Sequence, residues 1–114
     1  MNKTVLIVDD TEDIRFSLAE LVEVLMGWNT VIASNGKEGQ DVIKNSHSID
    51  IILSDLEMSP VNGVEFYEAI KDTGIPFILM SGHEDAPIIA KELGIAFIKK
   101  PYNVLDLSKI LSGF

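Results

Sequence analysis

Short apolar runs rich in Val and Ile recur five times along the chain, separated by longer and more polar segments. They occupy residues 4–8, 29–34, 50–54, 76–80 and 95–99. Half-exposed strands alternate apolar and polar residues, and these runs do not. Continuous apolar strands are typical of a parallel sheet that is covered on both faces. The pattern therefore predicts five buried parallel strands.

Helical periodicity fills the segments between these runs. Apolar residues recur there at spacings of three and four, in the sets Ile14, Leu18, Leu21, Val22 and Leu25, then Val64, Tyr67 and Ile70, then Val104, Leu107, Ile110 and Leu111. The segment 84–93 has Pro87 in its first turn and Gly94 just past its end, as helix boundaries prefer. The segment 36–45 completes a set of five expected helices.

Five strand–helix units of this size are expected to fold as one doubly wound sheet, because right-handed crossovers place helices on both of its faces. We expect a flavodoxin-like α/β domain over residues 1–114, with strand order 2-1-3-4-5. The length, with 46% hydrophobic residues, suits one domain with its own core. Ligands of such sheets bind outside the carboxyl ends of the strands, where the winding reverses. Functional residues are therefore expected at that edge.

Composition excludes several classes of function. The net charge of −9 argues against direct binding of nucleic acid or anionic membranes and favours cations as ligands. The absence of cysteine excludes disulfides and thiolate chemistry. No run approaches bilayer length, and no signal peptide is evident. We expect a cytoplasmic protein, and we interpret His47 as a loop residue.

Acidic and polar residues gather where the expected strands end. Asp9 and Asp10 follow the first strand, Asp55 the third, Ser81 the fourth and Lys100 the fifth. Two carboxylates about 4 Å apart repel by about 4 kcal/mol at an effective dielectric of about 20, so a cation is needed to offset them. Mg²⁺ suits a site with few protein oxygens, because it keeps several waters and accepts phosphate oxygens. The sequence predicts a magnesium site that Asp55 faces.

Each of these residues also has a purely structural interpretation. Asp10 with Asp13, or Thr11 alone, could cap the following helix. Ser81 begins an S-x-x-E capping box, Asp55 could be a turn residue, and Lys100 could be a solvated strand end. Because residues from four different strands converge on one edge, we favour a shared site.

Five landmarks, in order and suitably spaced, carry a family resemblance. They are VLIVDD with Asp9 and Asp10, IILSDLEM with Asp55, the following Gly63, ILMSG with Ser81, and FIKKP with Phe97, Lys100 and Pro101. Over essentially its whole length the chain resembles the receiver domain of two-component response regulators, the family of the bacterial chemotaxis response regulator. That protein has the order 2-1-3-4-5, so our expected strand order is not independent of the resemblance.

The resemblance implies a phosphoacceptor and a metal site. Asp55 corresponds to the residue that takes a phosphoryl group from a phosphohistidine of a partner. Mg²⁺ would be held by Asp10, Asp55 and the backbone carbonyl of Glu57, and Asp9 would act through metal-bound water. Lys100 would pair with Asp55 and then with the phosphoryl oxygens.

The resemblance also implies a conformational switch. Ser81 would donate its hydroxyl to the phosphoryl group, and Phe97 would follow it inward. The bond from Lys100 to Pro101 is typically cis in this family. Glu57 and His83 occupy positions that the family varies. Two interpretations stay open: both tune the lifetime of the aspartyl phosphate, or Glu57 is a solvated loop acid and His83 a surface residue at a helix start.

The implied partners are a sensor histidine kinase or phosphotransfer protein, and a downstream protein that contacts helix four, strand five and helix five, about residues 84–112. The chain would be a signalling domain with slow self-dephosphorylation rather than an enzyme.

Two alternative functions remain open. The D-x-E-x-S run at 55–59 faintly echoes the D-x-D-x-T loop of haloacid dehalogenase-type phosphatases, although no residues remain for their cap. The other alternative is a degenerate receiver that binds a partner without being phosphorylated.

Overall fold

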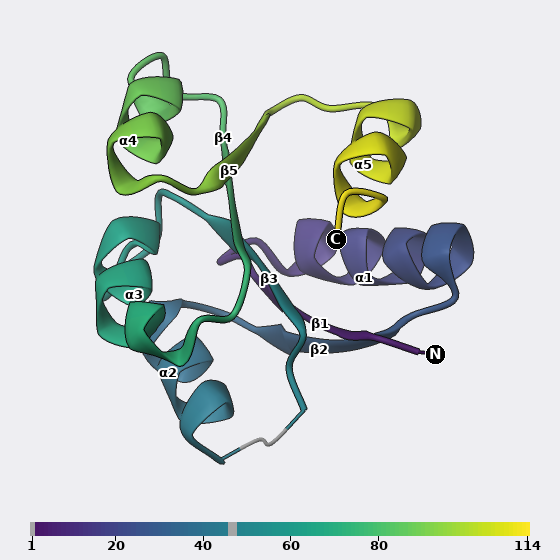
Figure 1. Ribbon diagram of the computed structural model, residues 1–114, viewed down its shortest axis with the longest axis horizontal. Helices are drawn as coiled ribbons and strands as arrows, with labels where there is room; N and C mark the ends of the chain where they lie inside the picture. The colour runs from purple at the N-terminus through teal and green to yellow at the C-terminus, as the bar shows by residue number, and fades with distance from the viewer. Residues whose placement is uncertain (1, 46–47) are drawn as a thin grey trace.

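A computed structural model describes residues 2–45 and 48–114, so the interpretation of His47 lies outside the described residues. The five predicted strands form one parallel sheet in the order β2-β1-β3-β4-β5, which confirms the expected topology (Figure 1). The strands are β1 (Thr4–Val8), β2 (Asn29–Ala33), β3 (Ile51–Asp55), β4 (Phe77–Ser81) and β5 (Ala96–Lys99).

All five predicted helices are present. They are α1 (Glu12–Met26), α2 (Gly36–Asn45), α3 (Gly63–Ile70), α4 (Ala86–Leu93) and α5 (Val104–Leu111), with a 3₁₀ turn η1 (Lys71–Thr73) after α3. Left-handed glycines end α1 and α4, since Gly27 and Gly94 have φ of 67° and 71°. A side chain at either position would meet backbone strain, so glycine stops these helices where the sequence indicated.

The helices cover both faces of the sheet and bury a separate apolar cluster on each (Figure 1). One face packs against α1 and α5, and the other packs against α2, α3 and α4. Successive strand residues point to opposite faces. In β1, Leu6 therefore joins one cluster and Ile7 the other. This two-sided burial explains why the strand sequences lack polar alternation.

Small parts of the sequence prediction were wrong. The third and fourth strands each lie one residue further along than expected, so Asp55 and Ser81 are the last strand residues rather than the first loop residues. Ile14 belongs to the expected apolar stripe of α1 but is 39% exposed. Ile14 instead lines a hollow between α1 and the segment after β5. Within the described residues, no helix is both long and apolar enough to cross a membrane.

Candidate functional site

The sheet brings the predicted site residues to one edge. Asp9 and Asp10 directly follow β1, Asp55 ends β3, Ser81 ends β4, and Lys100 directly follows β5. In a parallel sheet these carboxyl ends lie side by side, so residues from four strands meet although they are distant in the chain.

Three carboxylates form a cluster at this edge. One oxygen from each of Asp9, Asp10 and Asp55 lies within 4.8 Å of the others. Asp9 is fully buried and Asp55 is 8% exposed, whereas Asp10 faces solvent. Solvent therefore reaches the cluster at Asp10 and is excluded from it at Asp9.

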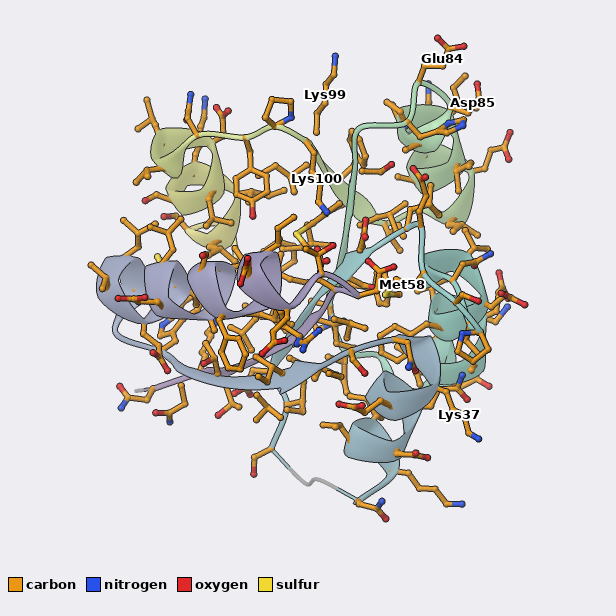
Figure 2. All side chains as sticks on the ribbon, turned by 180° about the vertical axis from the view of Figure 1, so that it is seen from behind. Lys37, Met58, Glu84, Asp85, Lys99 and Lys100 are labelled. Carbon is orange, nitrogen blue, oxygen red and sulfur yellow. The ribbon has the colours of Figure 1, made fainter. Side chains whose placement is uncertain are left out.

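Lys100 provides the positive charge of the cluster. Its Nζ lies 3.0 Å from Asp9 Oδ2 and 3.3 Å from Asp55 Oδ1. Its neighbour Lys99 points away from the protein, while Lys100 turns inward toward the sheet edge (Figure 2). The sequence resemblance led us to expect a pair with Asp55, and the shorter contact with Asp9 was not anticipated.

The environment shifts the ionisation of both partners. Burial raises the pKa of the Asp55 carboxyl above its ordinary value, the charge of Lys100 opposes this, and Asp9 and Asp10 reinforce it. Burial alone would lower the pKa of Lys100, but its hydrogen bonds and charge interactions with Asp9 and Asp55 outweigh burial, so the pKa is raised. Lys100 therefore stays charged, while the negative charge on Asp55 is disfavoured.

Asp9 and Asp10 differ in the hydrogen bonds of their side chains. Asp9 uses both carboxylate oxygens, because Oδ1 accepts the Thr11 N–H at 2.9 Å and Oδ2 accepts Lys100. In the described part of the chain, no side-chain hydrogen bond or ion pair engages the Asp10 carboxylate. The oxygens free to bind a cation directly are therefore those of Asp10 and one of Asp55. Such a set of hard oxygen donors fits Mg²⁺.

The helix-capping interpretations hold only in part. Thr11 is the N-cap residue of α1, but its side chain makes no capping hydrogen bond. The predicted capping box at Ser81 does not form, because α4 begins later, at Ala86. Instead, the Ser81 side chain is buried at the end of β4, and its Oγ accepts the His83 N–H at 2.9 Å.

The bond from Lys100 to Pro101 is cis, as the resemblance implied, and Phe97 lies beside α4. Phe97 is half-buried on β5 and packs against the cluster that contains Ala86 and Ala90 of α4.

Glu57 and His83 are both exposed and line one groove beside the site. This groove has a volume of about 520 Å³, and Met58 and Ile89 contribute apolar walls. Neither side chain belongs to the carboxylate cluster. They take no part in the contacts of Lys100.

The loop from β3 to α3 is held by features that sequence reasoning missed. Asn62 and Glu65 form a reciprocal capping box at the start of α3. Gly63 N–H donates to Leu56 O at 2.8 Å, and a Cβ at Gly63 would lie 2.9 Å from the Cα of Leu56. The N-x-x-E pattern could have revealed the cap. The close approach at Gly63, which holds the residues next to Asp55, has no local sequence signal.

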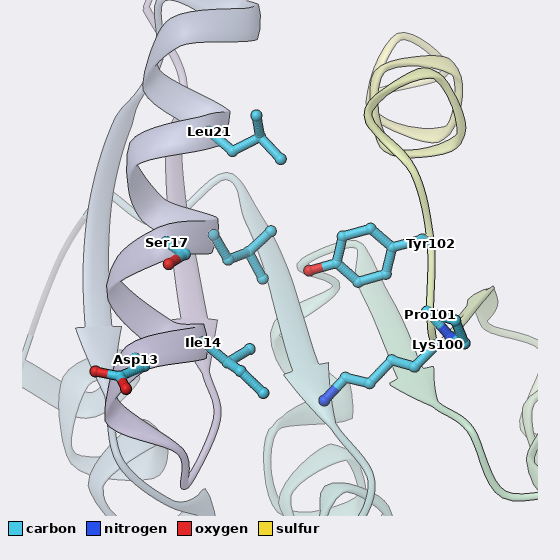
Figure 3. Close-up of a pocket in the computed structure, with 8 residues that line it drawn as sticks. Asp13, Ile14, Ser17, Leu21, Lys100, Pro101 and Tyr102 are labelled. Atoms are coloured by element: carbon cyan, nitrogen blue, oxygen red, sulfur yellow. The ribbon is translucent and has the colours of Figure 1, made fainter.

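A second hollow of about 620 Å³ lies between α1 and the segment after β5 (Figure 3). Ile14 and Leu21 of α1 face Tyr102 across it, and Lys100 borders it on the side of the carboxylates. Burial raises the pKa of the Tyr102 hydroxyl above its ordinary value. This hollow is mainly apolar and does not contain the carboxylate cluster, so we do not assign the chemistry to it.

Comparison with known proteins gives one consistent family. Residues 5–112 match the model of the response regulator receiver domain. The transcriptional regulatory protein CpxR of Escherichia coli is 33% identical over 111 residues, which cover 94% of this chain and 46% of CpxR. The sensor kinase/phosphatase LuxN of Vibrio harveyi is 36% identical over 81 residues, covering 69% of this chain and 9% of LuxN. The chain thus spans less than half the length of these relatives.

Solved structures agree with this result. A CheY-like receiver domain protein from Methanospirillum hungatei is 28% identical with a TM-score of 0.87, covering 99% of this chain and 93% of that protein. The chemotaxis protein CheY4 of Vibrio cholerae is 25% identical with a TM-score of 0.85, covering 99% and 98%. The similarity extends over nearly the whole of both structures.

Proposed function

Because this chain belongs to the response regulator receiver domain family, we propose that it is a phosphorylation-dependent signalling domain with Asp55 as the phosphoryl acceptor. We propose that residues 1–114 make up this one domain. The observation that carries the proposal is the position of Asp55, whose carboxylate lies 3.3 Å from Lys100 and beside two further carboxylates at the end of β3.

In the proposed reaction, a carboxylate oxygen of Asp55 attacks the phosphorus of a phosphohistidine on a partner protein. A new O–P bond forms, the N–P bond breaks, and the imidazole nitrogen leaves with the electron pair and takes up a proton. Carboxylates are known nucleophiles for such acyl phosphates. Phosphoryl transfer depends mainly on positioning and on neutralising charge, which a buried strand end with a fixed lysine supports.

Lys100 and Ser81 supply the contacts to the phosphoryl group in this proposal. Lys100 moves from the carboxylates of Asp9 and Asp55 to the phosphoryl oxygens. Ser81 Oγ already accepts the His83 N–H. Its own proton is therefore available for donation to a phosphoryl oxygen.

We further propose that Asp10, Asp55 and the backbone carbonyl of Glu57 hold Mg²⁺, with Asp9 acting through metal-bound water. The different hydrogen bonding of Asp9 and Asp10 supports this division, since both Asp9 oxygens are already engaged. When bound, Mg²⁺ supplies positive charge that offsets the carboxylates and the incoming phosphoryl oxygens. The roles of Glu57 and His83 in the lifetime of the phosphate are part of the proposal.

The switch in this proposal runs from Ser81 to Phe97. The phosphoryl group adds charge and strong acceptor oxygens, which draw in Ser81 and the loop before α4. Phe97, packed on the same side of the sheet as α4, then turns inward. Moving a population from 1:99 to 99:1 requires about 5.5 kcal/mol of differential binding, which a few charge-assisted contacts can supply.

For partners, we propose a sensor histidine kinase or phosphotransfer protein upstream, and a protein target on the surface of α4, β5 and α5. Relatives whose names denote a sensor kinase and a transcriptional regulator support kinase partners of this kind.

We propose a cytoplasmic location, without direct binding of nucleic acid or membrane. Receiver domains are generally not enzymes, and we propose slow self-dephosphorylation as the only turnover. A phosphatase of the haloacid dehalogenase type is not favoured, because the family match covers residues 5–112.

Intact-mass measurement after incubation with acetyl phosphate and Mg²⁺ tests the proposal. We expect a mass gain of one phosphoryl group in the natural chain, and none in Asp55→Asn or with a chelator present. A gain that persists in Asp55→Asn contradicts the assignment of the acceptor. Absence of any gain in the natural chain would favour a degenerate receiver, and continuous release of phosphate from unrelated esters would favour a phosphatase.

A further inference from the structure

Arg15 is the only arginine of the chain, and it lies in the first turn of α1. Its half-buried side chain donates a hydrogen bond of 2.8 Å from Nη1 to the backbone carbonyl of Asp9. A cation in the first turn opposes the helix dipole, so Arg15 does not stabilise α1 through its charge. Within the described residues, no carboxylate forms an ion pair with it. The guanidinium also lies over the ring of the neighbouring Phe16, 5.8 Å from its centroid. Among the described residues, its hydrogen bond is therefore with the loop that carries the acids.

The contact fixes one side of Asp10. The carbonyl that Arg15 binds belongs to the peptide between Asp9 and Asp10. The next peptide is held as well, because the Thr11 N–H donates to Asp9 Oδ1 at 2.9 Å. Peptide groups are planar, so a residue between two fixed peptides has little freedom in φ and ψ. Arg15 and Asp9 together therefore set the direction of the Cα–Cβ bond of Asp10, from which its carboxylate extends.

Within the described residues, few other contacts hold Asp10 in place. The Thr11 side chain makes no capping bond at the start of α1. The Asp10 side chain faces solvent, and its oxygen meets the cluster without a side-chain hydrogen bond. Asp9 differs, because its carboxylate is held at both oxygens. The placement of Asp10 thus depends on its backbone.

We propose that Arg15 is a positioning residue. It directs the Asp10 carboxylate into the cluster and so raises the affinity of the metal site for Mg²⁺. The inference rests on the proposed metal site and adds to it a residue that touches no ligand. Groups that orient metal ligands typically change affinity by about 10- to 100-fold. Lysine keeps the charge of Arg15 but replaces its fork of donors with a single ammonium.

The test compares three variants of the full chain. Arg15→Met removes the donor and keeps the aliphatic length, Arg15→Lys keeps a donor, and Lys91→Met removes the same charge from an exposed position of α4. Two quantities are measured by NMR: the dissociation constant for Mg²⁺, and the order parameters of the Asp10 and Thr11 amides in metal-free protein.

We expect Arg15→Met to weaken Mg²⁺ binding by about 10-fold or more. Its amide order parameters should fall from about 0.85 toward about 0.6. Arg15→Lys should recover most of the affinity, and Lys91→Met should match the natural chain. If Arg15→Met fails to fold, Arg15→Leu, which also lacks a donor, replaces it under the same criteria.

Failure of this inference and failure of the metal site give different results. Natural affinity and natural order parameters in Arg15→Met would overturn the role of Arg15 while leaving the metal site intact. If the natural chain does not bind Mg²⁺, or Asp10→Asn binds it equally well, the proposed metal site is wrong. The order parameters of the Asp10 and Thr11 amides in metal-free protein then still test the positioning role of Arg15. Lower values in Arg15→Met support that role, and unchanged values overturn it.

Discussion

The ammonium nitrogen of Lys100 lies 3.0 Å from Asp9 Oδ2, although 91 positions separate the two residues in the chain. Lys100 also lies 3.3 Å from Asp55, so one cation serves two buried carboxylates. In the proposed reaction, the Lys100 ammonium must also bind the phosphoryl oxygens. The electrostatics of the edge before and after phosphorylation therefore depend on Lys100.

Replacing Lys100 with methionine should destabilise the protein. The substitution leaves Asp9 and Asp55 without their shared donor, and hydrogen bonds to charged groups contribute about 1.5–3 kcal/mol each. We expect the free energy of unfolding, measured by urea denaturation in chelator, to fall by about 3 kcal/mol or more. The exposed neighbour provides the control, because Lys99→Met should change stability by less than about 0.5 kcal/mol. Equal stability of the two variants would show that the pairing of Lys100 contributes nothing.

Asp55→Asn should stabilise the metal-free protein at neutral pH. Burial, with Asp9 and Asp10, raises the pKa of Asp55 in the folded state above the ordinary value of 3.8, even though Lys100 opposes the shift. The contribution of Asp55 to stability is therefore fully present below about pH 3.8 and is lost as the pH rises through the folded pKa.

Urea denaturation of both proteins, from below pH 3.8 to pH 7, checks the direction of this change in stability. The natural chain and Asp55→Asn should be similar in stability at low pH, with the variant becoming the more stable one as the pH increases. A variant that is less stable than the natural chain at pH 7 would contradict the raised pKa.

Magnesium should stabilise the folded chain by mass action. A ligand that binds only the folded state adds about 2.7 kcal/mol when its free concentration is 100 times its dissociation constant. Thermal unfolding should therefore shift upward with Mg²⁺ and return with chelator, and Asp10→Asn should abolish the shift. Asp13→Asn is the matched control, since Asp13 is an exposed acid of α1 outside the cluster. An equal loss in both variants would mean that overall charge, and not the cluster, binds the metal.

Sequence reasoning predicted the strands and helices because burial on both faces leaves a strong pattern in each strand, whereas the expected strand order was not independent of the family resemblance. It also placed Asp9, Asp10, Asp55, Ser81 and Lys100 at one edge, since parallel strands end together. Which acid the Lys100 ammonium contacts depends on side-chain rotamers, and no sequence pattern encodes that choice. The S-x-x-E pattern at Ser81 was misleading, because local pattern does not reveal that the serine is still inside a strand.

Gly63→Ala should disturb the strand end that carries Asp55. A Cβ there would lie 2.9 Å from the Cα of Leu56 and 3.0 Å from a methyl carbon of Leu79, so the loop or the core must move. Overpacking of this kind costs about 1–3 kcal/mol. We expect a loss of stability in that range and slower phosphorylation by acetyl phosphate. Gly113→Ala is the control, because its nearest contact would be an ordinary 3.4 Å. Unchanged stability and rate in Gly63→Ala would show that the loop adapts freely.

Glu57→Ala and His83→Ala should change how long the aspartyl phosphate lasts. Both side chains are exposed in the groove beside the site, where attacking water would approach. Glu57 is expected to repel or redirect that water, so its removal should shorten the lifetime. The decay of phosphorylated protein is followed by intact mass after the phosphodonor is removed. Decay rates equal to that of the natural chain would remove both residues from the mechanism.

The central claim is that Asp55, among the three clustered acids, becomes esterified. Borohydride reduces an aspartyl phosphate to homoserine, so tandem mass spectrometry of the reduced and digested protein identifies the acceptor. After treatment with acetyl phosphate and Mg²⁺, we expect homoserine at position 55 and none in samples treated with chelator. Homoserine in place of Asp9 or Asp10, or its absence from every peptide, would show that Asp55 is not the acceptor.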